Sequence, residues 1–226
     1  FKHKSLITKI SINNAKSVAQ IKYQTVLLNI DALILAGTMA QAATLSEAQV
    51  KRAVRFCQTR RYVLRDTTIL LLSFYTGLRA KEIAALRFGD VYDDDGSVRR
   101  QFSLTAAQTK CARTRTVFVN KQLAQQLAAY STWRNTSHAA APLFPSQKGG
   151  HFSANTMCQL FLNIYKACGL SDASSHSGRR TFITRLASKG VGVRVLAALA
   201  GHNSISTTQR YIDVNDAQLA NAVELL

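Results

Sequence analysis

No stretch of this sequence is long and apolar enough to span a lipid bilayer. The longest apolar-looking run, Val26 to Ala36, is interrupted by Asn29 and Asp31, and it falls well short of the roughly 20 residues that a spanning helix needs. The first residues, Phe-Lys-His-Lys, lead into no unbroken apolar stretch of the kind that marks a secretory signal. We therefore expect no transmembrane segment.

The cysteines form no C-x-x-C pair. Four of them, Cys57, Cys111, Cys158 and Cys168, are scattered singly along the chain. This spacing argues against a zinc knuckle and against a disulfide framework. We interpret them as reduced, mostly structural thiols of a cytoplasmic protein.

Acidic residues are scarce. Asp and Glu number 12 against 29 Lys and Arg, which gives a formal charge of +17 and a pI near 10.2. This excess is too lopsided for a typical soluble metabolic enzyme and indicates a polyanionic partner. Nucleic acid and an anionic membrane surface both attract such a protein, and composition alone does not choose between them.

Predicted helices account for most of the chain, and a small β region interrupts them. Thr44 or Ser46 can cap a helix through Phe56, and Gly77 suits the end of another. The other segments with helical spacing are Ile21 to Ala36, Asp66 to Tyr75, Lys81 to Leu86, Lys121 to Trp133, Ala154 to Cys168, Gly178 to Ser188, Val193 to Ala200, Ser206 to Tyr211 and Asn215 to Leu225. Val98 to Leu104 and Arg115 to Val119 alternate as strands do.

The most informative stretch for chemistry is Ser175 to Thr181. If it is helical, His176 and Arg179 are three residues apart and project from one face. An imidazole and a guanidinium could then converge on one anionic group, and phosphate fits that geometry. The alternative is that His176 caps the helix and that Arg179 and Arg180 are solvated basic residues.

A second histidine, His202, precedes Tyr211 by nine residues, with a turn at Gly201. A phenol ionises near pH 10 in water, so it attacks poorly at neutral pH unless cations and hydrogen-bond donors stabilise the developing charge. The alternative is that Tyr211 only packs its ring against the last helices.

Five motifs in series closely resemble the catalytic signature of tyrosine recombinases and phage-type integrases. They are Thr76-Gly77-Leu78-Arg79-Ala80-Lys81-Glu82-Ile83, Thr109-Lys110, His176-x-x-Arg179, Gly201-His202 and Tyr211. Each alone would be weak, but their order and separations make the resemblance specific over about residues 44 to 226. It implies a mainly α fold with a small antiparallel β-sheet, of the α+β class, namely the catalytic domain of this family.

The resemblance also implies roles for the basic residues and the tyrosine. Arg79 and Arg179 would hold the non-bridging oxygens of the scissile phosphate, which is electrostatic catalysis, and Lys110 would protonate the leaving 5′ oxygen. His176 would assist proton transfer with the tyrosine. His202 would hydrogen-bond the phosphate, and Tyr211 would be the nucleophile that forms a 3′-phosphotyrosyl bond.

Such chemistry needs neither a cofactor nor ATP, because the covalent bond keeps the energy of the phosphodiester. No metal ion is expected either, since cationic side chains take the place of divalent ions. The one compact carboxylate cluster, Asp93 to Asp95, precedes Gly96 and is typical of a solvated turn.

The implied partner is double-stranded DNA, bound by a homo-oligomer that forms a tetrameric synapse, with host or accessory DNA-bending proteins as further partners. The segment Asn215 to Leu225 could dock on a neighbouring protomer or on its own domain. We expect a cytoplasmic, nucleoid-associated protein of a mobile genetic element in a prokaryote. Residues 1–43 would be a helical segment or the remnant of a DNA-grasping domain, and residues 44–226 the catalytic domain.

Three alternatives remain open. Val193 to Gly201 followed by Ser204 to Tyr211 also has the pattern of a helix-turn-helix, which would make the protein a non-catalytic DNA-binding regulator. On that view Arg79, Lys110 and the His176 motif have no explanation. A type IB topoisomerase shares the same attack but relaxes supercoils. A membrane-surface protein has little beyond charge in its favour, so we expect no membrane partner.

Overall fold

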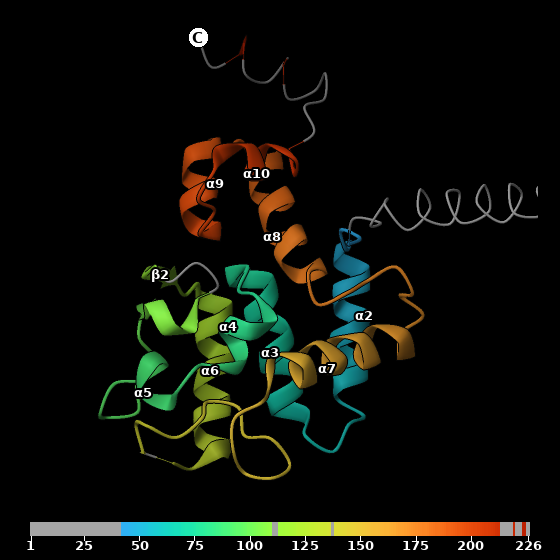
Figure 1. Cartoon of the computed structure of the whole chain (residues 1–226). Helices are drawn as coiled ribbons and strands as arrows, with labels where there is room; N and C mark the ends of the chain where they lie inside the picture. The colour runs from blue at the N-terminus through green and yellow to red at the C-terminus, as the bar shows by residue number, and fades with distance from the viewer. Residues whose placement is uncertain (1–41, 110–112, 137, 213–218, 220–222, 225–226) are drawn as a thin grey trace, which may run out of the picture. The chain divides into compact units, whose positions relative to one another are not determined.

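The computed structural model describes residues 42–109, 113–136, 138–212, 219, 223 and 224. The chain divides into two units, Phe1–Gln41 and Ala42–Leu226, and all described residues belong to the second (Figure 1). The predicted helix at 21–36 lies outside the described residues. So does the predicted helix at 215–225, except for residues 219, 223 and 224. Among the described residues, no helix has the length and apolarity needed to cross a membrane.

The second unit begins with a capped helix and continues into a buried one. Ser46 accepts the backbone N–H of Gln49, and the Gln49 side chain accepts the N–H of Ser46, so a capping box starts α2 (Glu47–Cys57) as predicted. The next helix, α3 (Val63–Thr76), is buried along most of its length. It packs against α2 and against the later helices at residues 80–84, 121–134 and 177–188. These contacts make α3 the central element.

Short and long helices surround α3. They are α4 (Ala80–Ala84), α5 (Phe88–Val91), α6 (Lys121–Arg134), α7 (Ala154–Ala167), α8 (Ser177–Ser188), α9 (Val193–Ala200) and α10 (Ile205–Gln209). Figure 1 shows α8, α9 and α10, in orange to red, grouped together, and α8 packs on α3. The predicted helices match these elements closely. Two elements were not predicted, α5 and the one-turn 3-10 helix η1 (Ala106–Gln108).

The predicted β region is an antiparallel pair of short strands, β1 (Gln101–Leu104) and β2 (Arg115–Phe118). Gln101 lies opposite Phe118, and Leu104 lies opposite Arg115. The strands bury alternate residues, as their sequence pattern predicts. The predicted mainly helical fold with a small antiparallel sheet is confirmed.

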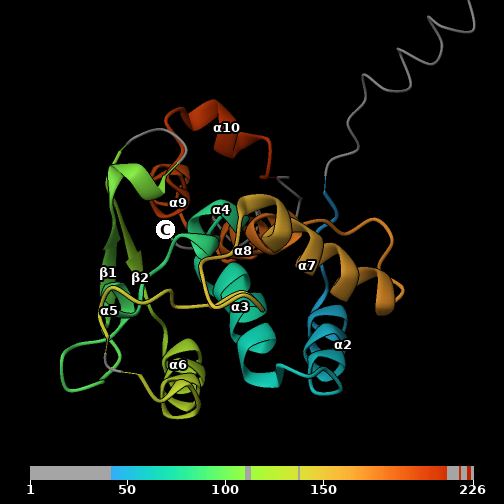
Figure 2. The ribbon, with the colours of Figure 1, turned by 60° about the horizontal axis from the view of Figure 1, so that its bottom comes forward.

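One hydrophobic cluster joins α2, α3, α4, α6 and α7 to the hairpin. Two of its buried tyrosines have satisfied hydroxyls: Tyr92 donates to Leu127 O and Tyr130 donates to Leu143 O, each at 2.8 Å. The buried hydroxyl of Tyr165 has no hydrogen-bond partner among the described residues. Cys57 and Cys168 are buried free thiols. α8 packs on the core helix α3, and α9 packs on α8 (Figure 2).

Candidate active site

The turn at Gly77 sets the position of Arg79. Gly77 ends α3 with a φ of +63°, a left-handed conformation that favours glycine. A Cβ on Gly77 would also lie 2.7 Å from Cδ1 of Phe182 in α8, so the chain can reverse this closely against α8 because the residue is glycine. Two residues later, Arg79 becomes the N-cap of α4.

Arg179 lies in the first turn of α8 and is only 4% exposed. Its Nη1 donates to Gly77 O at 2.8 Å and its Nη2 donates to Ala200 O. Both carbonyls belong to helix C-terminal ends, where unpaired carbonyls carry partial negative charge. Burial, with the nearby guanidinium groups of Arg79 and Arg115, lowers the pKa of Arg179 to about 9. The group therefore stays charged at neutral pH.

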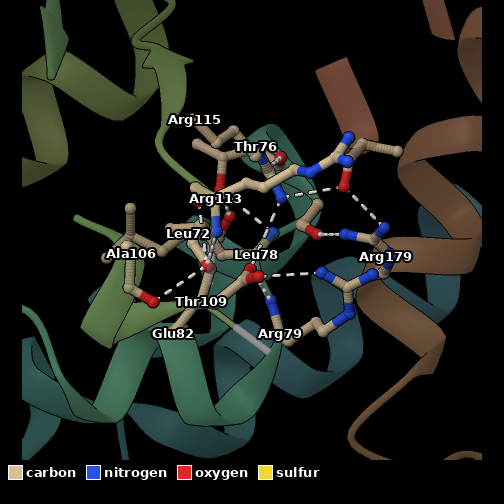
Figure 3. Close-up of polar contacts among 12 residues, drawn as sticks. Leu72, Thr76, Leu78, Arg79, Glu82, Ala106, Thr109, Arg113, Arg115 and Arg179 are labelled. Atoms are coloured by element: carbon tan, nitrogen blue, oxygen red, sulfur yellow. Dashed lines mark hydrogen bonds and ion pairs between the residues drawn. The ribbon is translucent and has the colours of Figure 1, made fainter. Parts of the chain in front are cut away.

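Glu82 is the carboxylate of this cluster, 1% exposed. Its Oε1 pairs with Nη1 of Arg79 at 2.8 Å, and its Oε2 accepts the backbone N–H of Arg79 at 2.8 Å. Nη1 of Arg115 approaches Oε2 at 3.4 Å (Figure 3). One carboxylate thus holds the guanidinium of Arg79 in place. Sequence reasoning included Glu82 in a motif but gave it no role. Its place in the predicted helix Lys81 to Leu86, three residues after Arg79, was a usable signal.

Arg115 is the second residue that sequence reasoning missed. It begins β2 and is 8% exposed. Its Nη1 donates to Ala200 O at 2.9 Å and its Nη2 donates to Thr76 O at 3.1 Å, which agrees with the place of β2 beside α9 in Figure 2. Arg115 therefore ties the hairpin to the ends of α3 and α9. The available signal was a charge at an inward position of an alternating strand.

Gly201 allows this close approach. It ends α9 with a φ of +64°, and a Cβ there would lie 2.6 Å from Cδ of Arg115. The next residue is His202, whose backbone N–H donates to Ala197 O at 2.9 Å. The predicted turn thus sets the place of both the buried guanidinium and the imidazole.

The turn brings His202 to Tyr211. Their rings stack with centroids 5.8 Å apart and planes 18° apart. Nδ1 of His202 lies 2.7 Å from the hydroxyl of Thr208. Burial lowers the pKa of His202 to about 4, assisted by the charges of Arg179, Arg79 and Arg115. The imidazole is therefore neutral at pH 7.

Tyr211 lies two residues beyond the end of α10, so the helix predicted to include it is shorter than expected. Its side chain is half-buried. The guanidinium of Arg180 lies 5.5 Å from its ring centroid, and its backbone carbonyl accepts the hydroxyl of Thr184 at 3.4 Å. An ionised Tyr211 would raise the pKa of Arg179, which places the phenol within electrostatic reach of the guanidinium cluster.

Of the two remaining predicted residues, the structure describes one, His176. His176 is exposed and is the N-cap of α8, so it precedes the helix whose first turn buries Arg179. Lys110 lies outside the described residues. Its neighbour Thr109 bonds across the loop, with its hydroxyl donating to Arg113 O at 2.9 Å and accepting Arg113 N–H at 3.1 Å.

A groove of about 630 Å³ opens beside the cluster, between β2 and α9. Its lining includes several cationic side chains and the imidazole, namely Arg79, Arg113, Arg115, Arg194 and His202. Among the described residues, His, Cys, Asp and Glu form no group of three that could hold a metal ion. Fixed guanidinium groups beside a neutral imidazole and a phenol can bind an anion and present it to an oxygen nucleophile.

Comparisons with known proteins found a family model and several curated relatives. The model of the phage integrase family matches residues 43–218. The tyrosine recombinase XerC of Myxococcus xanthus is 32% identical over 164 residues, which is 69% of this chain and 52% of the relative. Transposase A from transposon Tn554 of Staphylococcus aureus is 28% identical over 190 residues, 80% of this chain and 51% of the relative. The chain spans about half the length of these curated relatives.

Solved structures resemble the fold over most of the chain. A crystal structure of XerA recombinase superposes with a TM-score of 0.65 at 25% identity, covering 81% of this chain and 65% of the other. The Tn1549 transposon integrase in complex with transposon right end DNA gives a TM-score of 0.63 at 20% identity, covering 81% and 66%. The fold is therefore that of a tyrosine recombinase catalytic domain.

Proposed function

We propose that this chain, which belongs to the phage integrase family, cuts and rejoins double-stranded DNA at a specific site through a covalent bond between Tyr211 and a 3′ phosphate. The observation that carries the proposal is the stacking of Tyr211 on a neutral His202, beside the buried guanidinium of Arg179. A phenol that only packed against the last helices would need no such neighbours.

The cations would stabilise the transition state of phosphoryl transfer. Two of the five N–H donors of Arg179 are used on carbonyl oxygens, which leaves donors for a non-bridging oxygen. Arg79, fixed by Glu82 and lining the groove, would hold the other oxygen. Because these groups are already oriented, they need little reorganisation when charge develops.

In the proposed step the phenolic oxygen of Tyr211 attacks phosphorus and loses its proton, with His176 assisting. The bond from phosphorus to the 5′ oxygen breaks, and that oxygen takes up a proton, from Lys110 by the resemblance. One phosphoester bond replaces another, so a 5′ hydroxyl can reverse the reaction without ATP.

The proposed partner is duplex DNA held in a tetrameric synapse. The formal charge of +17 supports a polyanionic partner. Among the relatives, the Tn1549 integrase is in complex with transposon DNA and XerH is bound to its difH substrate. The tetramer, the accessory proteins and the assignment of residues 1–43 and 44–226 to separate domains are parts of the proposal.

The test is a trapped covalent intermediate. Nicked duplexes tiled across the DNA that flanks the coding sequence are incubated with the chain, so that cleavage near the nick releases a short strand and prevents rejoining. We expect an adduct that survives denaturing electrophoresis and is lost in Tyr211→Phe. Tyr62→Phe, a change at the start of α3, is the matched control and should keep the adduct. An undiminished adduct in Tyr211→Phe contradicts the proposal, and binding without an adduct favours a regulator.

A further inference from the structure

Thr208 contacts both residues of the stacked pair. Its hydroxyl lies 2.7 Å from Nδ1 of His202, and its carbonyl accepts the backbone N–H of Tyr211 at 2.9 Å. The side chain lies in α10 and is fully buried. A residue with this placement can affect the chemical state of the imidazole without touching DNA.

Other helical threonines of this chain use their hydroxyls differently. Thr68, Thr76 and Thr181 each donate to the carbonyl four residues earlier in their own helix, a common bond for threonine in helices. Thr208 does not make this bond. Within the described part of the chain, Nδ1 of His202 is the only partner of its hydroxyl.

The proton of this hydroxyl determines the tautomer of the ring. A buried hydroxyl needs an acceptor for its hydrogen, because an unmade bond there costs about 1–3 kcal/mol. If Nδ1 carried the ring proton, it would donate to Thr208, and the hydroxyl hydrogen would have no acceptor among the described residues. If Nδ1 is unprotonated, the hydroxyl donates to it and both groups are satisfied.

We propose that Thr208 is a positioning residue whose hydroxyl donates to Nδ1 of His202 and holds the imidazole in the tautomer that carries its hydrogen on Nε2. The effect on DNA cleavage rests on the proposed function, whereas the contact between Thr208 and His202 is independent of it. An imidazole beside Arg79, Arg115 and Arg179 that presents an N–H can donate to an anionic phosphate oxygen. The opposite tautomer would present a lone pair at Nε2, which repels that oxygen.

The first measurement concerns the ring itself, in the full chain without DNA. Long-range ¹H–¹⁵N correlation spectra distinguish protonated from unprotonated ring nitrogens, and the spectrum of His202→Gln assigns the signals. We expect Nε2 protonated and Nδ1 unprotonated in the wild type and in Thr208→Ser. In Thr208→Val, where a methyl group replaces the hydroxyl, we expect a mixture of tautomers. Thr207→Val, the neighbouring change in α10, is the matched control and should leave the spectrum unchanged.

The second measurement is single-turnover cleavage of the duplex that yields the adduct. We expect Thr208→Val to cleave about tenfold more slowly, the factor that one hydrogen bond of ordinary strength supplies. Thr208→Ser and Thr207→Val should cleave at close to the wild-type rate, and DNA affinity should be unchanged in all three.

The outcomes separate the two proposals. A wild-type spectrum with the proton on Nδ1, or a Thr208→Val ring still wholly in the Nε2–H form, overturns the role of Thr208 whatever the activity. Failure of the wild type to form an adduct overturns the proposed function and leaves the spectra to decide the tautomer. If Thr208→Val does not fold, the wild-type and Thr208→Ser spectra remain decisive. Both must show a proton on Nε2 and none on Nδ1, and a proton on Nδ1 in either protein overturns the role of Thr208.

Discussion

Gly201→Ala is expected to destabilise the protein much more than a matched change at Gly190. Both glycines follow helices and both have positive φ, +64° at Gly201 and +80° at Gly190. They differ in their surroundings: a Cβ on Gly190 would meet nothing within 4 Å, whereas one on Gly201 would lie 2.6 Å from Cδ of Arg115. The pair therefore isolates the packing of Arg115 from backbone strain.

The magnitudes follow from these two terms. A left-handed conformation costs an alanine roughly 1–2 kcal/mol, which is the whole expected loss for Gly190→Ala. In Gly201→Ala the side chain of Arg115 must also move, and its guanidinium is held by Ala200 O, Thr76 O and Glu82. Losing one hydrogen bond to a charged group costs about 1.5–3 kcal/mol more.

Urea unfolding gives the free energies directly, and thermal unfolding checks them. An extra loss of about 1.5–3 kcal/mol corresponds to a further fall in Tm of about 3–12 °C for a domain of this size. Cleavage should fall in Gly201→Ala, whose neighbour His202 stacks on Tyr211, and should persist in Gly190→Ala. Equal losses of stability in the two variants would refute the reasoning that a Cβ at residue 201 displaces the side chain of Arg115 and breaks one of its hydrogen bonds.

Three further predictions follow from the same site and core. Arg179→Ala should lose most cleavage yet keep much of its DNA affinity, measured by fluorescence anisotropy, because affinity is shared among many cations; parallel losses would contradict this. The pKa of His202 is about 4 in the folded state against 6.5 ordinarily, so the unfolded chain binds a proton that the folded chain does not, and stability should fall as pH falls from about 6.5 towards 4. Thermal unfolding of His202→Gln should show a weaker fall over that window. Burial raises the pKa of the Cys57 thiol to about 12, so peptide mapping after alkylation at pH 8 should find it labelled only in unfolded protein.

The local sequence pattern predicted the helices and the hairpin well, because each element is marked by residues within or next to it. Ser46 caps α2, Gly77 ends α3 and alternation marks the strands, as the structure confirms. Its failures were also local: α5 has four residues and η1 has three, too few for a periodic pattern. The predicted helix Ser206 to Tyr211 extends two residues beyond the end of α10 at Gln209, because nothing in the pattern of Arg210 and Tyr211 marks the true end.

Sequence reasoning named residues of the candidate site but not their arrangement. The motif series contained Arg79, Arg179, His202 and Tyr211, and the structure brings these four together. Arg115 could not be placed, because its bonds to Ala200 O and Thr76 O join segments that are far apart in the chain. The sequence around Arg115 does not indicate that its side chain will pack against Gly201 at the end of α9.

Under the proposed function, the charge balance of the cluster would favour a transition state over a bound phosphodiester. In the part of the chain that the structure describes, three guanidinium groups, from Arg79, Arg115 and Arg179, lie near one carboxylate, that of Glu82. Counting these groups leaves two positive charges beside a neutral His202. Carbonyl oxygens at the ends of α3 and α9 hold this excess in place without neutralising it. A phosphodiester brings one negative charge, and the five-coordinate state of the proposed reaction gathers more on its oxygens. The buried excess therefore interacts more strongly with that state than with the bound substrate, which is the condition for electrostatic catalysis.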